Sequence, residues 1–307
     1  MFERVLYATD FSEYAQKIME CLGEIPGIKE IIVLHVIDTK RIAYGEESES
    51  ALIKKAELAL QEQKKRLEST EKTVETKIKV GIPSREILHA ADEEIPSLVV
   101  MGARGMSLIK DILLGSVSSD VLRYGKTNLL IMRHKVAGKL EREAFEKYEC
   151  MYPGTPPVDL ISRECKGAVF EKYCDRIFSK VLYPTDFSKS PEQILSLLWQ
   201  IPNAGKIILV HAIDKGETIE ELDTFVKEAG EKLKDIQERL IGAGFSVEHH
   251  IHIGNPSYEI NRVAEEEDVS LIAIGTRGKG LIEEIRLGST AENVVRNAKR
   301  PVLILRV

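Results

Sequence analysis

The sequence is poor in cysteine, in long apolar runs and in positive charge, and each shortage excludes a class of protein. The four cysteines among its 307 residues are too few and too scattered for a disulfide framework, and they form no Cys-x2-Cys pair of the kind that binds zinc. No apolar run is long enough to cross a bilayer, and a net charge of -6 offers no basic surface for nucleic acid. We therefore expect a soluble, cytoplasmic protein with reduced thiols that binds neither membranes nor nucleic acid.

An internal repeat is the first positive feature of the chain. Three segments of the first half recur in the same order in the second half: residues 5–12 and 181–188, 31–38 and 207–214, and 81–84 and 254–257. A repeat of this length indicates two tandem domains, each large enough for its own core. We predict domains over 1–134 and 176–307, joined by a partly helical linker over 135–175.

Each half alternates short β-branched runs with longer helical stretches, which is typical of a parallel sheet with helices on both faces. The strands are expected near 4–9, 31–36, 73–80, 97–101 and 128–132, and near 180–185, 206–212, 246–253, 270–274 and 301–306. The predicted fold class is α/β, with two tandem Rossmann-like domains that each contain a five-stranded parallel sheet. An exposed apolar strand at a sheet edge can pair with another molecule and cause aggregation. We therefore expect the two fifth strands to pair with each other inside the chain. Association of two such chains into a homodimer through other surfaces is left open.

Helix starts are marked at corresponding places in the two halves. Serine or proline follows the first, third and fourth strands, at Ser12 and Ser188, Pro83 and Pro256, and Ser116 and Ser289. These residue types cap a helix or occupy its first turn. The longest amphipathic helices are expected over 51–67 and 218–240.

A glycine pattern occurs at the same place in both halves, after the fourth strand. It reads Gly-x2-Gly-x9-Gly-Ser and consists of Gly102, Gly105, Gly115 and Ser116, and again of Gly275, Gly278, Gly288 and Ser289. Glycine lets the backbone turn sharply and lets a phosphate approach the N–H groups at a helix start. The pattern predicts two phosphate-binding sites, and a tight turn without a ligand is the alternative.

The glycine pattern, a Thr-Asp pair after each first strand and a histidine near the end of each second strand together resemble the universal stress protein family. The chain is similar to a tandem member with two complete domains of the ATP-binding type, and only the linker lies outside the resemblance. The resemblance implies an adenine nucleotide alpha hydrolase-like fold. It also implies that ATP or AMP, with or without Mg²⁺, lies across the carboxyl ends of the strands, where open parallel sheets bind their ligands.

The resemblance also gives a role to each position of the two sites. Asp10 and Asp186 would accept hydrogen bonds from the ribose or hold a divalent cation. Val36 and Ala212 would contact adenine through their backbones, and the first-turn N–H groups after the glycine pattern would face the phosphates. The expected nucleotide-binding residues are Thr9, Asp10, Val36, Gly102, Arg104, Gly105, Gly115, Ser116 and Val117, and Thr185, Asp186, Ala212, Gly275, Arg277, Gly278, Gly288, Ser289 and Thr290.

Several of these side chains have a second interpretation. Asp10 and Asp186 also suit the negative charge favoured at a helix start, and the arginines between the paired glycines either close over the phosphates or stay solvated. His35 and His211 are expected to be core residues rather than catalytic ones. His250 and His252 share a strand face and suggest a metal site, but an exposed sheet edge is the stronger interpretation of that face.

Two classes of function fit the sequence. The first is a regulatory protein that senses ATP or AMP and passes its bound state to an unknown protein partner. It is favoured because the chain has no Gly-x4-Gly-Lys-Ser/Thr loop and no evident base for activating water. The alternative is a slow Mg-dependent ATPase or phosphotransferase. A flavin-using electron carrier is a third hypothesis, which predicts a yellow protein.

Overall fold

The computed structural model describes residues 2–25, 27–44, 47–68, 72–104, 114–133, 177–276 and 287–306. The first half contains β1 (Arg4–Thr9), α1 (Glu13–Glu24), β2 (Glu30–Asp38), α2 (Thr39–Ala43), α3 (Glu49–Glu68), β3 (Thr73–Gly81), α4 (Pro83–Glu94), β4 (Leu98–Gly102), α5 (Ser116–Tyr124) and β5 (Leu129–Met132). The second half contains β6 (Lys180–Pro184), α8 (Pro191–Leu198), β7 (Lys206–Ile213), α9 (Ile219–Gly242), β8 (Ser246–Ile253), α10 (Pro256–Glu266), β9 (Leu271–Gly275), α11 (Ser289–Asn297) and β10 (Val302–Leu305).

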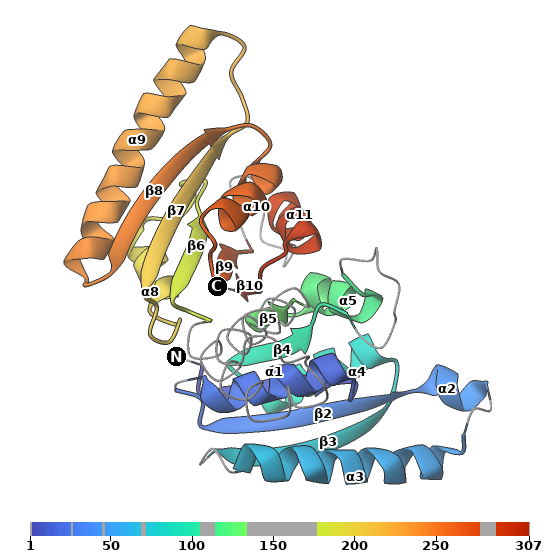
Figure 1. The fold of residues 1–307 in the computed structure, drawn as a ribbon. Helices are drawn as coiled ribbons and strands as arrows, with labels where there is room; N and C mark the ends of the chain where they lie inside the picture. The colour runs from blue at the N-terminus through green and yellow to red at the C-terminus, as the bar shows by residue number, and fades with distance from the viewer. Residues whose placement is uncertain are drawn as a thin grey trace, which may run out of the picture.

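All these strands belong to one ten-stranded sheet, in the order β3-β2-β1-β4-β5-β10-β9-β6-β7-β8. Neighbouring strands within each half are parallel, as the alternation of strands and helices predicts. Figure 1 shows the two halves on either side of the central strands, with α3 and α9 far from the seam. The predicted α/β class, with five strands in each half, is therefore confirmed.

The two halves meet at their fifth strands. Strands β5 and β10 pair antiparallel, so that Leu303 lies opposite Leu130 and Ile304 lies opposite Leu129. Every residue of both strands is buried. The pairing places these apolar edges inside the sheet, the arrangement expected from their composition.

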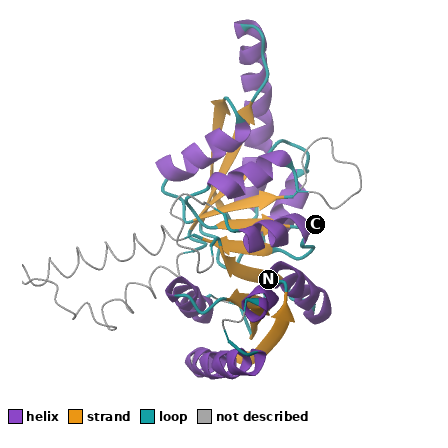
Figure 2. Cartoon of the chain, turned by 90° about the vertical axis from the view of Figure 1, so that its right-hand side faces the viewer, coloured by secondary structure: helices purple, strands orange, loops and turns teal. Residues whose placement is uncertain are grey.

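Helices cover both faces of the sheet (Figure 2). Successive strand residues point to opposite faces and so contribute to a separate hydrophobic core on each face. Val5 and Tyr7 of β1 belong to the core that also contains residues of α1, α3, α8 and α9, whereas Leu6 belongs to the core on the other face, with residues of α4, α5, α10 and α11. Both cores include residues of β5 and β10 and so continue across the seam.

The predicted helix starts are correct at most positions and wrong at one. Ser12 caps α1 by accepting a hydrogen bond from the Ala15 N–H, and Pro83 and Pro256 begin α4 and α10. The expectation of a helix start at Ser188 is wrong, because α8 begins at Pro191. There Ser190 forms a capping box with Gln193, which satisfies two N–H groups at once.

Two further expectations concern the cysteines and the linker. Cys21 of α1 is 2% exposed and disulfide-bonded, which corrects the expectation that all the thiols are free. Cys150, Cys165 and Cys174 lie outside the described residues, as does the predicted linker. Among the described helices, none combines the length and the apolar character needed to cross a membrane.

Candidate functional site

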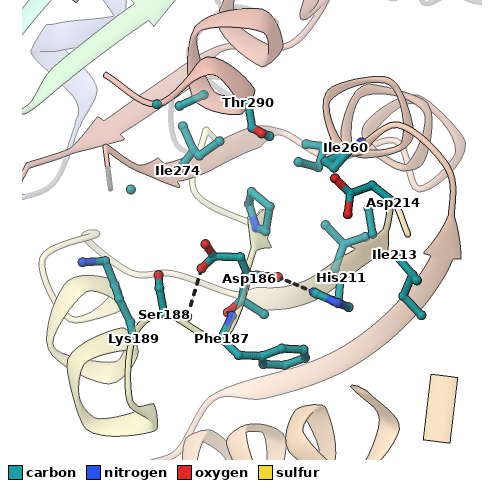
Figure 3. A pocket seen from close by; sticks show the side chains of 18 of the residues that line it. Asp186, Phe187, Ser188, Lys189, His211, Ile213, Asp214, Ile260, Ile274 and Thr290 are labelled. Atoms are coloured by element: carbon teal, nitrogen blue, oxygen red, sulfur yellow. Dashed lines mark hydrogen bonds between the residues drawn. The ribbon is translucent and has the colours of Figure 1, made fainter. Parts of the chain in front are cut away.

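A cavity of about 840 Å³ lies in the second half, at the carboxyl ends of β6, β7 and β9. Figure 3 shows side chains from these strand ends, from α10 and from the start of α11 pointing into the same space. Seven of the residues expected to bind nucleotide line this cavity: Thr185, Asp186, Ala212, Gly275, Gly288, Ser289 and Thr290. The fold therefore brings together positions that are separated by up to 105 residues in the sequence.

The turn after β6 is shaped by the Thr-Asp pair itself. The Thr185 hydroxyl oxygen accepts a hydrogen bond from the Phe187 N–H at 3.1 Å, and Asp186 Oδ1 accepts one from the Ser188 N–H at 3.0 Å. Phe187 takes a φ of 62°, a left-handed conformation that is strained for a bulky residue. Two side-chain hydrogen bonds in a row hold this turn and fix the Asp186 carboxylate at the cavity wall (Figure 3).

The turn after β1 repeats this geometry. The Thr9 hydroxyl oxygen accepts from the Phe11 N–H at 3.2 Å, and Phe11 has a φ of 61°. Asp10 Oδ1 accepts from the backbone N–H of Ser12 at 3.1 Å and from its hydroxyl at 2.6 Å. The same residue types at the same offsets therefore build the same turn in both halves.

The second carboxylate oxygen of Asp10 is buried and has no hydrogen-bond partner in the described part of the chain. A buried acceptor without a donor costs on the order of 1–3 kcal/mol, and more when it is charged. This oxygen is therefore suited to accept a hydrogen bond from a bound molecule or to coordinate a cation.

A histidine supports each turn from the neighbouring strand. His35 Nδ1 lies 2.9 Å from the Thr9 carbonyl oxygen, and His211 Nδ1 lies 2.8 Å from that of Thr185. The ring of Phe11 stacks on that of His35 with centroids 4.1 Å apart. Burial lowers the pKa of His35, so that its ring is neutral and donates from Nδ1 to the carbonyl. The geometry gives this histidine a role in positioning the turn, as expected of a structural residue.

The glycines that flank the sites have a packing role. A Cβ atom on Gly102 would lie 3.0 Å from the Arg104 carbonyl oxygen and 3.1 Å from Cε1 of Tyr14. Gly115 is the N-cap of α5 and approaches the Ala103 carbonyl oxygen, to which its N–H donates at 2.8 Å. The tight turn is thus a sufficient reason for Gly102, so this glycine does not by itself demonstrate a ligand.

The helices that follow the glycine pattern begin without a side-chain cap. Gly115 and Gly288 are the N-cap residues of α5 and α11, so serine does not cap these helices as its position suggested. Ser116 and Ser289 instead occupy the first helical position. First-turn N–H groups that no side chain satisfies form a favourable place for an anion.

The remaining expected site residues fall into two groups. Val36 lies in β2, Gly102 ends β4, and Val117 follows Ser116 in α5, all at the same end of the first-half sheet as Asp10. Gly105, Arg277 and Gly278 lie outside the described residues.

Sequence reasoning missed some residues of the cavity wall. Phe225 and Lys232 reach it from α9, and Phe187 follows the Thr-Asp pair, with its ring 5.5 Å from the Lys232 ammonium. The phenylalanine after each Thr-Asp pair could have been identified from the sequence, because it recurs at the same place in both halves. The α9 residues carried no such signal, since α9 and α3 differ in length and sequence.

Comparison with known proteins identifies the family. The universal stress protein family model matches residues 1–133 and 178–306. The chain is 34% identical to universal stress protein MJ0577 of Methanocaldococcus jannaschii over 155 residues, which are 42% of this chain and 96% of that protein. The crystal structure of a universal stress protein from Archaeoglobus fulgidus superposes with a TM-score of 0.65 at 28% identity and covers 99% of this chain and 97% of its own. The chain therefore belongs to the universal stress protein family and carries two of its domains in tandem.

Proposed function

We propose that this protein binds an adenine nucleotide, ATP or AMP, at one site in each half and acts as a cytoplasmic regulator in the stress response. The observation that carries the proposal is the second-half cavity, in which the Asp186 carboxylate and the uncapped start of α11 face the same space. A nucleotide needs both features, because its ribose donates hydrogen bonds and its phosphates accept them.

The size and chemistry of the cavity support this ligand. Small-molecule pockets typically span about 300–1,000 Å³, and the cavity of about 840 Å³ falls within that range. Asp186 is the acceptor for the ribose hydroxyls, or for Mg²⁺ when the cation accompanies the phosphates. The N–H groups of Ser289 and Thr290 bind the phosphates, and the backbone of Ala212 lies beside adenine.

The first half supplies an independent argument for a second site. Asp10 Oδ2 is buried and has no partner among the described residues, and Ser116 begins an uncapped helix at the same end of the sheet. A ligand with a hydroxyl donor at one end and an anion at the other satisfies both groups. In this proposal Thr9, Asp10, Val36, Gly102, Gly115, Ser116 and Val117 bind the first nucleotide, with Arg104 and Gly105 beside them.

We favour regulation over catalysis because the histidine beside each Thr-Asp turn is held by the structure in the described part of the chain. His35, whose ring is neutral, is engaged by the Thr9 carbonyl, and His211 is engaged by the Thr185 carbonyl. Binding therefore acts by changing the attachment of a protein partner, which recognises the nucleotide-bound state.

Isothermal titration with ATP and with AMP tests the proposal. The wild-type protein is expected to bind two nucleotides per chain, whereas Asp10→Ala and Asp186→Ala are each expected to lose one of them. The matched control is Asp92→Ala, because Asp92 is an exposed carboxylate outside the cavity that faces Lys126 at 3.5 Å. Absence of both heat and thermal stabilisation at millimolar nucleotide would refute nucleotide binding. Steady phosphate release that stops in the double variant would instead indicate the ATPase.

A further inference from the structure

Three potential metal-binding side chains gather at the outer edge of the second-half sheet, away from the nucleotide cavity. Glu248 and His250 lie two residues apart on β8 and so share one face of the strand, and Glu267 is the C-cap residue of α10. One nitrogen or oxygen atom from each of the three lies within 4.8 Å of the others. Two carboxylates and an imidazole at this separation can bind a single ion.

The imidazole of His250 places its Nε2 atom beside Glu267. Its Nε2 atom is inaccessible to solvent and has no hydrogen-bond partner among the described residues, and Glu267 Oε1 lies 3.4 Å away. Glu248 is 54% exposed, so the cluster remains open to an ion from solution. The nitrogen that would ligate the ion therefore faces a carboxylate oxygen and has no competing bond.

At the corresponding place in the first half, a lysine lies between two carboxylates. Alignment of β8 with β3 and of α10 with α4 puts Glu75, Lys77 and Glu94 at the corresponding positions. The Lys77 ammonium lies between the two carboxylates, 3.2 Å from Glu75 Oε1 and in direct contact with Glu94. The first half thus carries its own cation at the centre of the cluster. In the second half an imidazole replaces this ammonium.

Two lysines contact the second-half cluster from outside. Lys206 lies 2.6 Å from Glu248 Oε2, and Lys180 lies 3.0 Å from Glu267 Oε2. Each lysine therefore engages one oxygen of its carboxylate, and Oε1 of Glu267 remains directed at His250. Contacts of this kind orient metal-ligating carboxylates in established sites.

We propose that Glu248, His250 and Glu267 bind a divalent first-row transition ion such as Zn²⁺. An imidazole ligand favours Zn²⁺, Co²⁺ or Ni²⁺ over Mg²⁺ and Ca²⁺, which prefer an all-oxygen environment. With three protein ligands, a tetrahedral ion completes its coordination with water. The site is specific to the second half, because Lys77 occupies the corresponding place in the first.

Titration of tag-free, nucleotide-free protein with Zn²⁺ by calorimetry, and with Co²⁺ by visible spectroscopy, tests the site. One equivalent is expected to bind to the wild type. His250→Lys reproduces the ammonium of the first half and is expected to weaken binding at least tenfold, and Glu248→Gln, at a more exposed position, is expected to act in the same direction. His89→Ala removes an exposed histidine outside the cluster and is expected to bind as the wild type does.

Circular dichroism and the thermal midpoint establish that each variant is folded. A wild type that takes up no Zn²⁺ at millimolar concentration would overturn the proposal, as would a folded His250→Lys protein that binds as tightly as the wild type. Neither result bears on nucleotide binding, because the cluster shares no residue with the cavity.

Discussion

The guanidinium of Arg123 lies 2.8 Å from the carboxylate of Glu292, although 169 residues separate them in the chain. Arg123 belongs to α5 and Glu292 to α11, the two helices that begin at the candidate sites. Arg296 of α11 binds the same carboxylate and also donates to the Ser119 hydroxyl of α5 at 3.2 Å. These polar contacts join α5 of the first half to α11 of the second half.

The first prediction concerns this network. Contacts with Arg296 and Arg123 lower the pKa of Glu292, so its ionised form stabilises the fold. That contribution is present above the carboxylate's unfolded pKa, about 4.3, and is lost as the pH falls through the lower folded value. We expect Glu292→Ala to lower the thermal midpoint modestly at pH 7 and to differ less from the wild type at pH 3.

Differential scanning calorimetry across this pH range checks the prediction, with Glu238→Ala as the control. Glu238 is an exposed helical glutamate whose nearest lysine nitrogen lies 4.0 Å away, so its removal should change little at any pH. An equal loss from Glu292→Ala at both pH values would contradict the electrostatic account.

The second prediction concerns the apolar seam. Leu303 is 0% exposed and lies opposite Leu130, so its truncation leaves a cavity between the halves. We expect Leu303→Ala to reduce the free energy of unfolding by about 2–5 kcal/mol. Urea denaturation measures the loss. Leu58→Ala, at a helix position that is 62% exposed, should stay within about 0.5 kcal/mol of the wild type.

The third prediction concerns the start of α8. The Ser190 hydroxyl oxygen accepts a hydrogen bond from the Gln193 N–H at 3.3 Å, and the Gln193 side chain accepts one from the Ser190 N–H at 2.9 Å. Loss of such a cap costs about 0.5–2 kcal/mol, which we expect for Ser190→Ala in a chemical denaturation curve. Ser188→Ala is the matched control, because α8 does not begin there. Equal destabilisation by both variants would contradict the assignment of the cap.

The repeat made most of the fold predictable, because local patterns occur in it twice. The strands and the starts of α4 and α10 follow from residue type and spacing alone. Helix α2 was missed because it is a single short helix with no second-half counterpart, and its cap depends on the Asp38 side chain accepting from the Lys40 N–H. The start of α8 was misplaced because two serines compete and only Pro191 distinguishes them.

Contacts between elements were less predictable than the elements themselves. In the sequence, His250 and His252 share a strand face and suggest a metal site, but an exposed sheet edge was the stronger interpretation. The structure instead groups His250 with Glu248 and Glu267, while the Arg262 guanidinium contacts the His252 ring at 2.8 Å. Glu267 could not be recognised in advance, because its position depends on where α10 ends relative to β8.

The last prediction tests whether Gly102 is needed for packing of the turn after β4 or for nucleotide binding. A Cβ atom there would lie 3.0 Å from the Arg104 carbonyl oxygen and 3.1 Å from the Tyr14 ring, so the turn after β4 must shift in Gly102→Ala. We expect destabilisation of about 1–3 kcal/mol, together with weaker nucleotide binding in the first half only. Gly242→Ala is the control, since a Cβ on Gly242 meets nothing within 4 Å and alanine favours the helix. Denaturation and calorimetry on the same samples decide the matter, because unchanged stability with lost binding would mean that Gly102 serves the ligand and not the turn.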